Sequence, residues 1–261
     1  MTVLNNASEI LRCFSSDCTE LTVTDVVNRL GMPKSNASRL MKAMREAGLL
    51  ETIGDSKRHR PGRLFLNITA AFRSSSLLIQ MAADAVGRVS QSCGHTGYVS
   101  VRDGRDMMAV TDHPGSNALR VVSNLGRRLS AHASSTGRTL LARETDDAVR
   151  KLYAAGLPPA PNKSPATIDA LLHRLALIRA RGYDTSSDAA AVGIDALSVA
   201  VADPAQGEHV SLCIVFPGAV VGHAERSAIL AALCHEAAEI AKITGDAAFR
   251  AEPLSLTGTD A

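Results

Sequence analysis

The stretch GMPKSNASRLMKAMREAGLL, residues 31–50, carries hydroxyl, amide and basic side chains at the spacing of a DNA-binding helix. Its apolar residues fall within about 100° of one another on a helix, which makes them its buried side: Ala37, Leu40, Met41 and Met44. The residues that we expect to contact DNA are Lys34, Ser35, Asn36, Ser38, Arg39 and Lys42. No acidic residue occurs before Glu46, so the N-terminal half of the helix suits the negative charge of a DNA groove. A basic helix that only faces solvent is the alternative.

A cationic hairpin is expected directly after this helix. The segments LLETIG and RLFLNI read as two strands, and GDSKRHRPG between them is a turn rich in basic residues. The phosphate or minor-groove contacts predicted here are Lys57, Arg58 and Arg60. Because LTVTDVVNRLG before the first stretch reads as a helix ended by Gly31, the order of elements predicts a winged helix-turn-helix.

The charge distribution agrees with a nucleic-acid contact in this part of the chain. The 261 residues have a net charge of +2, yet residues 1–73 hold eleven Lys and Arg against seven Asp and Glu. The remaining residues hold seventeen against nineteen. A basic segment beside a mildly acidic remainder is typical of proteins that bind nucleic acid, and the expected partner is double-stranded DNA.

Other classes of protein are disfavoured by the sequence. The five cysteines, an odd number, show no CxxC spacing and the histidines show no metal-ligand spacing, so we expect no metal and no cofactor. The sequence has no apolar run of eighteen residues, and its start lacks the signal-peptide pattern. We therefore expect a cytoplasmic protein with reduced thiols and no membrane contact.

The remainder of the chain predicts an α+β domain with a mostly antiparallel sheet. A hairpin is expected at residues 98–110, around Asp103-Gly104, and another where ALSVAVAD is followed by VSLCIVFP. A helix over residues 74–92 precedes them, and it packs its apolar stripe either on its own domain or on a second subunit. The stripe consists of Leu78, Met81, Ala82, Ala85, Val86 and Val89.

From about residue 3 to residue 245 the chain resembles the IclR family of bacterial transcriptional regulators. The resemblance is carried by LTVTDVVNRLGMPKSNASRLMKAMREAGLLE, LSAHASSTGRTLLA, GYDTSSDAAAVGIDALSVAV and VSLCIVFP, in this order. It implies a winged helix-turn-helix joined by a helix to a GAF-like α/β domain that binds a small effector, in a homodimer or homotetramer. The implied domains are 1–73 for DNA binding, 74–92 as linker or dimerisation helix, 93–250 for effector binding and 251–261 as a disordered tail.

The resemblance also implies an effector site. Its residues would be Ser135, Thr136, Ser186, Ala196, Cys213 and Val215. Family members that bind small keto acids often have an acid at the loop position and hydroxyls in the last strand. This chain has Ser186 in the loop and the less polar Cys213 and Val215 in the strand. We therefore expect a monocarboxylate with an apolar or aromatic portion rather than a small, doubly charged keto acid.

Two features of this site allow more than one interpretation. Ser134, Ser135 and Thr136 lie at or just before a helix start, where they either bind an anion or simply cap the helix. His132 lies near the expected pocket mouth, where it either contacts the ligand or has no part in binding.

An enzyme and a ligand-independent DNA-binding protein are the rival classes. Asp184, Asp188 and Asp195 could form a carboxylate group, but nothing pairs them with a nucleophile, and GxSxG, HExxH and P-loop motifs do not occur. The large second domain argues against a protein that binds only DNA. We predict an effector-controlled regulator, because this class accounts for both the DNA-binding segment and the large second domain.

Overall fold

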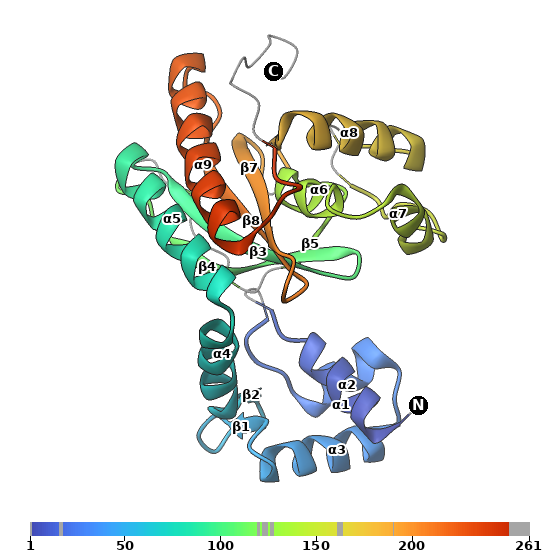
Figure 1. The fold of residues 1–261 in the computed structure, drawn as a ribbon. Coiled ribbons are helices and arrows are strands. Elements are labelled where there is room, and N and C mark those ends of the chain that lie inside the picture. The colour runs from blue at the N-terminus through green and yellow to red at the C-terminus, as the bar shows by residue number, and fades with distance from the viewer. Residues whose placement is uncertain are drawn as a thin grey trace. The chain divides into compact units, whose positions relative to one another are not determined.

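The computed structural model describes residues 2–15, 18–118, 121, 125, 128–160, 164–189 and 191–250. The chain divides into two compact units, residues 1–75 and residues 76–261, and each is described by itself (Figure 1). The tail expected over residues 251–261 lies outside the described residues. No helix within the described ranges is both long and apolar enough to cross a membrane.

The first unit consists, in its described residues, of helices and one short hairpin. The elements are α1 (Val3–Arg12), α2 (Val23–Leu30), α3 (Lys34–Glu46), β1 (Leu50–Thr52), β2 (His59–Pro61) and α4 (Leu64–Ser75). Thr22 and Asp25 form a capping box at the start of α2, because each side chain accepts a hydrogen bond from the backbone N–H of the other. Gly31 ends α2 with φ at 65°, a left-handed conformation that favours glycine.

The core of this unit fixes which side of α3 faces outward. Seven residues are buried together: Ile10, Leu21, Val26, Ala37, Met41, Met44 and Leu50. Three of them come from the predicted apolar side of α3, and Leu40 packs against the same cluster. The expected winged helix-turn-helix is confirmed, with β1 and β2 paired antiparallel and Leu21 bridged to His59 at the edge.

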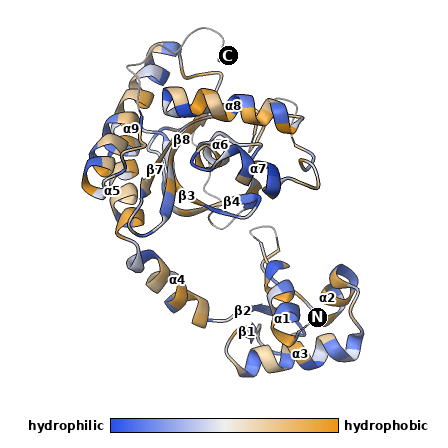
Figure 2. Ribbon diagram, turned by 45° about the vertical axis from the view of Figure 1, so that its right-hand side comes forward, coloured by the Kyte–Doolittle hydropathy of each residue, from blue (hydrophilic) through white to orange (hydrophobic). Residues whose placement is uncertain are grey.

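The second strand of the hairpin differs from the prediction. The segment RLFLNI is not a strand: β2 ends at Pro61, and a helix, α4, begins at Leu64. Leu64, Ile68 and Phe72 recur every four residues, which is a helical period. Their side chains are exposed, so neither strand pairing nor core burial forces this segment into the hairpin. Much of α4 is hydrophobic (Figure 2).

The second unit contains an antiparallel sheet with helices on both faces. Its elements are α5 (Leu77–Cys93), β3 (Thr96–Asp103), β4 (Asp106–His113), β5 (Arg128–Ser130), α6 (Ser135–Leu141), α7 (Asp146–Leu152), α8 (Ile168–Arg181), β6 (Tyr183–Ser187), β7 (Ile194–Asp203), β8 (Glu208–Pro217) and α9 (His223–Thr244). The described strands form one sheet in the order β5-β4-β3-β8-β7-β6, and all pairs are antiparallel. This confirms the expected α+β fold.

The two faces of this sheet have different chemistry. Residues of β7 and β8 with aliphatic side chains, such as Leu197, Val199, Leu212 and Ile214, pack with α5 and α9 in one buried core. The alternate residues of the same strands point to the opposite face, where α6 lies against β7 and β8. That second face carries many hydroxyl groups.

Helix α5 belongs to the core of the second unit. Of the predicted stripe, Leu78, Ala82, Ala85, Val86 and Val89 are buried in that core, and Met81 packs against it. The stripe thus packs on its own domain, which was one of the two expected alternatives. These side chains are not available as an interface with a second subunit, so the other alternative is wrong for this stripe.

Candidate functional site

The predicted DNA-contacting residues of α3 lie on its exposed side. Lys34, Ser35, Asn36, Ser38, Arg39 and Lys42 are all exposed. The Arg39 guanidinium donates a hydrogen bond from Nη2 to Oδ1 of Asn36 at 2.8 Å, and this bond orients Arg39 along the N-terminal half of the helix. Lys42 lies 3.8 Å from Glu46, one turn further on. Lys34 and Arg39 therefore lie in the part of the helix that carries no acid, whereas Lys42 is paired with Glu46.

The arginines of the hairpin are paired with carboxylates. Arg58 lies 3.4 Å from Glu20, and Arg60 lies 3.2 Å from Glu51. The two arginine side chains are 59% and 52% exposed, so each pair contributes little to stability and exchanges readily with another anion. Lys57 is also exposed, and among the described residues it makes no ion pair. A phosphate would compete with Glu20 and Glu51 for the two arginines but not for Lys57.

The six residues predicted to bind the effector line one cavity of about 110 Å³ in the second unit. Its wall is formed by Tyr98, Ser100, Met107, Ala109, Val121, Leu129, Ser134, Ser135, Thr136, Ser186, Ala189, Ala191, Ile194, Ala196, Cys213 and Val215. None of these side chains carries a charge at neutral pH. The structure therefore brings together the start of α6, the end of β6 and the pocket face of the central strands. Binding of a ligand by these residues stays a prediction.

The register of the sheet explains why these side chains meet. Ser198 of β7 pairs with Cys213 of β8, and Cys213 pairs with Tyr98 of β3, so the three lie in one row across the sheet. Ala196 and Val215 form the neighbouring row on the same face. Burial raises the pKa of Tyr98 to about 12, so its phenol stays protonated and brings no charge to the cavity wall.

A chain of hydroxyls closes one side of the cavity. The Ser186 hydroxyl donates to Ser135 Oγ at 3.1 Å, and Ser198 Oγ lies 2.9 Å from Ser135 Oγ and 3.1 Å from Thr136 Oγ1. Burial raises the pKa of the Cys213 thiol, against the opposing effect of hydrogen bonds with Ser198 and Thr136. Cys213 is therefore a neutral thiol within this polar cluster rather than a reactive thiolate.

Ser134 is the N-cap of α6, and its hydroxyl accepts a hydrogen bond from the Gly137 N–H at 3.0 Å. For Ser134 the capping interpretation is therefore correct. His132 is fully buried and does not line the cavity; its ring packs edge-on against Tyr153, with centroids 5.9 Å apart. Burial, assisted by the positive charges of Arg138 and Arg105, lowers the pKa of His132.

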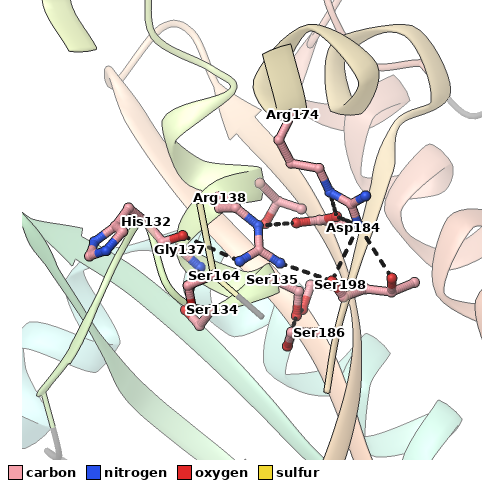
Figure 3. A network of polar contacts seen from close by, with 12 residues as sticks. His132, Ser134, Ser135, Gly137, Arg138, Ser164, Arg174, Asp184, Ser186 and Ser198 are labelled. Atoms are coloured by element: carbon pink, nitrogen blue, oxygen red, sulfur yellow. Dashed lines mark hydrogen bonds and ion pairs between the residues drawn. The ribbon is translucent and has the colours of Figure 1, made fainter. Parts of the chain in front are cut away.

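Arg138 does not line the cavity, and its guanidinium points toward Asp184 (Figure 3). Its Nε lies 2.6 Å from Oδ2 of Asp184, and its terminal nitrogens donate to the carbonyls of Ala133, at 2.9 Å, and Thr185, at 2.9 Å. Arg138 is 4% exposed and Asp184 is fully buried. The ion pair thus joins α6 to β6, the two elements that supply Ser135 and Ser186.

The three aspartates considered as a carboxylate group do not converge. Asp184 binds the guanidinium groups of Arg138, Arg174 and Arg181. Asp195 pairs with Arg226 at 2.7 Å, and Asp188 accepts a hydrogen bond from the Gly193 N–H at 2.6 Å. Within the described residues, no group of three or more His, Cys, Asp and Glu has a geometry that holds a metal ion.

Two parts of the cavity wall were not predicted from the sequence. Tyr98 and Ser100 on β3 line it, and so do apolar residues of β4 and β5. A signal existed in the strand TGYVSV, where Thr96, Tyr98 and Ser100 alternate with apolar residues and so predict a polar face. Ser198 was also missed, although its hydroxyl joins Ser135 and Thr136.

Comparison with known proteins assigns both units to one family. A model of the IclR helix-turn-helix domain matches residues 3–54, and a model of the bacterial transcriptional regulator IclR C-terminal region matches residues 71–242. The chain is 26% identical over 201 residues to the HTH-type transcriptional regulator XynR of Escherichia coli (strain K12), covering 76% of this chain and 79% of that protein. It is 23% identical over 203 residues to the transcriptional repressor IclR of the same organism, covering 77% and 74%.

Solved structures show the same fold. The IclR transcriptional regulator from Alicyclobacillus acidocaldarius superposes with a TM-score of 0.82 at 19% identity, covering 93% of this chain and 98% of that one. An IclR homologue from Microbacterium hydrocarbonoxydans, complexed with 4-hydroxybenzoate, has a TM-score of 0.75 at 22% identity, covering 94% and 100%. The relatives are regulators rather than enzymes, so the enzyme alternative is set aside. The chain belongs to the IclR family of bacterial transcriptional regulators and carries the helix-turn-helix DNA-binding domain of that family.

Proposed function

We propose that this regulator binds operator DNA through α3 and the hairpin and that a small organic acid in the second unit's cavity controls its output. The acid has one carboxylate and an apolar or aromatic body. The observation that supports this effector class is a cavity whose wall combines hydroxyls on one side with apolar side chains elsewhere and holds no charged group.

The size of the cavity favours a small molecule. Its volume of about 110 Å³ is close to that of an engineered apolar cavity, ~150 Å³, that binds benzene. Met107, Leu129, Ile194 and Val215 offer apolar contacts to a ring or a short chain. The related regulator complexed with 4-hydroxybenzoate lends support to an aromatic acid, although its sequence is only 22% identical.

The hydroxyl cluster favours one carboxylate over two. The hydroxyls of Ser135, Thr136, Ser186 and Ser198 carry four O–H groups, and three hydrogen bonds among them use three, so at most one O–H is left for a ligand. Ser134 can supply another O–H, because its oxygen only accepts from the Gly137 N–H. Two donors satisfy one carboxylate. A second carboxylate would be buried without a cation, since Arg138 is bound to Asp184.

Calorimetry with matched acids tests this proposal. Benzoate and 4-hydroxybenzoate should bind, whereas the dicarboxylates succinate and oxaloacetate should not. Val215→Asp should abolish binding, because it places an unpaired carboxylate beside the ligand, while Val220→Asp, at a position that is 62% exposed, serves as the control. Gel shifts on a selected operator should show the acid response in the Val220 variant but not in the Val215 variant.

Two results would contradict the proposed effector. The first is tight binding of a compact dicarboxylate that Val215→Asp leaves unchanged. The second is the absence of any heat or melting shift with the monocarboxylates, because a ligand that binds only the folded state must raise the melting temperature. Circular dichroism of both variants checks that loss of binding is not loss of folding.

We also propose that the protein acts as a homodimer or homotetramer, since two-fold assemblies read paired half-sites on DNA. Helix α4 supplies the apolar surface for such an interface: none of its residues is buried within the chain, and Leu66, Ile68 and Phe72 are 72%, 50% and 51% exposed. Sedimentation equilibrium should give a dimer or a tetramer, and Phe72→Glu should shift it toward the monomer. A wild-type monomer at micromolar concentration would refute this part.

A further inference from the structure

Ser100 is a second polar point in the effector cavity, apart from the hydroxyl cluster. It lies on β3, lines the cavity and is 1% exposed. Its Oγ has no hydrogen-bond partner among the described residues. A buried hydroxyl without a partner costs free energy, and most buried polar groups in folded proteins are paired. The hydroxyl of Ser100 is therefore a group that a ligand could satisfy.

Its neighbours in the sheet do not supply the missing bond. Ser100 pairs in register with Ser211 of β8 and Ala109 of β4. The Ser211 hydroxyl already lies 2.9 Å from Thr139 Oγ1 of α6, and alanine has no polar side chain. A register shift between Val99 and Ser100 marks a bulge at this point of the β3–β4 pair. Bulges often lie beside functional sites, where they redirect a side chain.

We propose that Ser100 determines effector specificity by hydrogen bonding to a hydroxyl or carbonyl group at the end of the acid remote from its carboxylate. This inference rests on the proposed function, because it needs the carboxylate to lie at the Ser134–Thr136 side of the cavity. The effector is then a hydroxy- or oxo-substituted monocarboxylate rather than an unsubstituted one.

The spacing of the sheet agrees with a small ligand. Ser198 and Tyr98 lie in one row on either side of β8, and Ser100 is two residues further along β3. With strands ~4.8 Å apart and a rise of ~3.3 Å per residue, Ser198 and Ser100 are separated by about 12 Å in a flat sheet. Ser198 bonds to Ser135 and Thr136, so this backbone separation places Ser100 well apart from the hydroxyl cluster, with room for a small ligand between them.

The Ser100 hydroxyl favours acids that carry a polar group at this end and disfavours acids that lack one. It can donate to a carbonyl and can donate to or accept from a hydroxyl, so either substituent pairs with it. An acid with only hydrogen or methyl at that end leaves the Ser100 hydroxyl buried and unpaired. Sites that bond a ligand hydroxyl reject analogues that lack it for this reason.

Calorimetry on the full chain tests the inference with benzoate and its 3- and 4-hydroxy derivatives. Wild type should bind one hydroxybenzoate about tenfold more tightly than benzoate, which corresponds to one hydrogen bond of ordinary strength. Ser100→Ala should remove this preference, and the affinity for benzoate should stay the same or rise, because the variant removes the hydroxyl that benzoate leaves unpaired. Its melting temperature without ligand should stay the same or rise, because the variant removes an unpaired buried hydroxyl.

Thr111→Val is the matched control. Thr111 is 2% exposed and its hydroxyl also has no partner among the described residues, but it does not line the cavity. This variant should keep the wild-type preference for the hydroxybenzoate. The comparison separates the loss of a ligand contact from the general effect of removing an unpaired hydroxyl.

The outcomes distinguish this inference from the proposed function. If wild type binds the acids without preference, or if Ser100→Ala keeps the preference, the role of Ser100 is refuted and the monocarboxylate site stands. In that case a bound water rather than the ligand satisfies Ser100. If none of the acids binds wild type, the effector class itself is wrong and the inference falls with it.

Discussion

Replacement of Asp184 tests whether its ion pairs stabilise the fold around the cavity. Its carboxylate is fully buried and meets three guanidinium groups, with Arg138 Nε at 2.6 Å, Arg174 Nη2 at 2.6 Å and Arg181 Nη2 at 3.1 Å. Asp184→Asn keeps the shape of the side chain but leaves three positive charges without their common anion. Since removing one partner of a buried ion pair costs about 3–5 kcal/mol, we expect a loss of this size.

Arg138→Met should cost less, and the structure shows why. Asp184 would keep Arg174 and Arg181. The Ala133 carbonyl would keep the Ser164 hydroxyl at 3.3 Å, and the Thr185 carbonyl would keep Arg174 at 3.4 Å. The variant therefore loses charged hydrogen bonds without leaving a charge unpaired, which is worth about 2–3 kcal/mol.

The combination of the two substitutions provides the decisive comparison. Arg138→Met removes one of the three cations that Asp184→Asn leaves unpaired, so the double variant should lose less stability than the sum of the single losses. Urea denaturation followed by circular dichroism measures all three, since the chain has no Trp for fluorescence. Both single variants should also weaken binding of benzoate, because the ion pair joins α6 to β6.

An exposed ion pair provides the control for this series. Arg150 lies 2.9 Å from Asp169, and their side chains are 52% and 80% exposed. Arg150→Met should change the free energy of unfolding by less than about 1 kcal/mol. The reasoning is refuted if Asp184→Asn is no worse than this control, or if the losses from the two buried substitutions are simply additive.

Further predictions concern pH and DNA. The folded-state pKa of His132 is lowered from 6.5 mainly by burial, so the unfolded chain binds more protons and the free energy of unfolding should fall as pH drops below about 6.5. His132→Phe, which keeps the ring contact with Tyr153, should flatten this dependence in urea titrations. Arg39→Ala should weaken operator binding by ~1–3 kcal/mol in gel shifts, while Lys57→Ala should weaken all sequences alike and lower the salt slope by about one. Glu51→Gln should strengthen binding to all sequences, because it releases Arg60; unchanged affinity would refute phosphate contact by the hairpin.

Most of the elements could be predicted from the sequence because their signals are local. The apolar period of α3, the capping residues of α2 and the alternation in β7 and β8 each lie within one segment. The strand prediction for RLFLNI was wrong because these six residues, 63–68, taken alone suit a strand, and only the longer period of four through residue 72 reveals a helix. The stripe of α5 could not be assigned to a partner, since an amphipathic helix shows that its apolar side is covered but not by what.

The candidate site was only partly predictable because its wall depends on strand register. The positions implied by the family resemblance, from Ser135 to Val215, line the cavity together. Ser198 and Ser100 were not predicted, because their place follows from which residues of β3, β7 and β8 pair, and pairing between distant strands cannot be read from one sequence. The ion pair of Arg138 could not be predicted for the same reason. No residue near Arg138 in the sequence indicates that it binds Asp184, which lies 46 positions further along the chain.

The register that builds the cavity also stabilises the domain, so the two properties cannot be separated in β7 and β8. Leu197 and Leu212 face α5 and α9. The next residue along each strand, Ser198 in β7 and Cys213 in β8, faces α6. A slip of one residue would turn the hydroxyls into the aliphatic core and the leucines into the cavity, so the helices on one face enforce the chemistry of the other. The hydroxyl-bearing face gains little stability, because hydrogen bonds contribute only about 0.5–1.5 kcal/mol each. An apolar face would make the domain more stable than this hydroxyl-bearing face does. A loss of stability of this kind is expected where a strand lines a binding site.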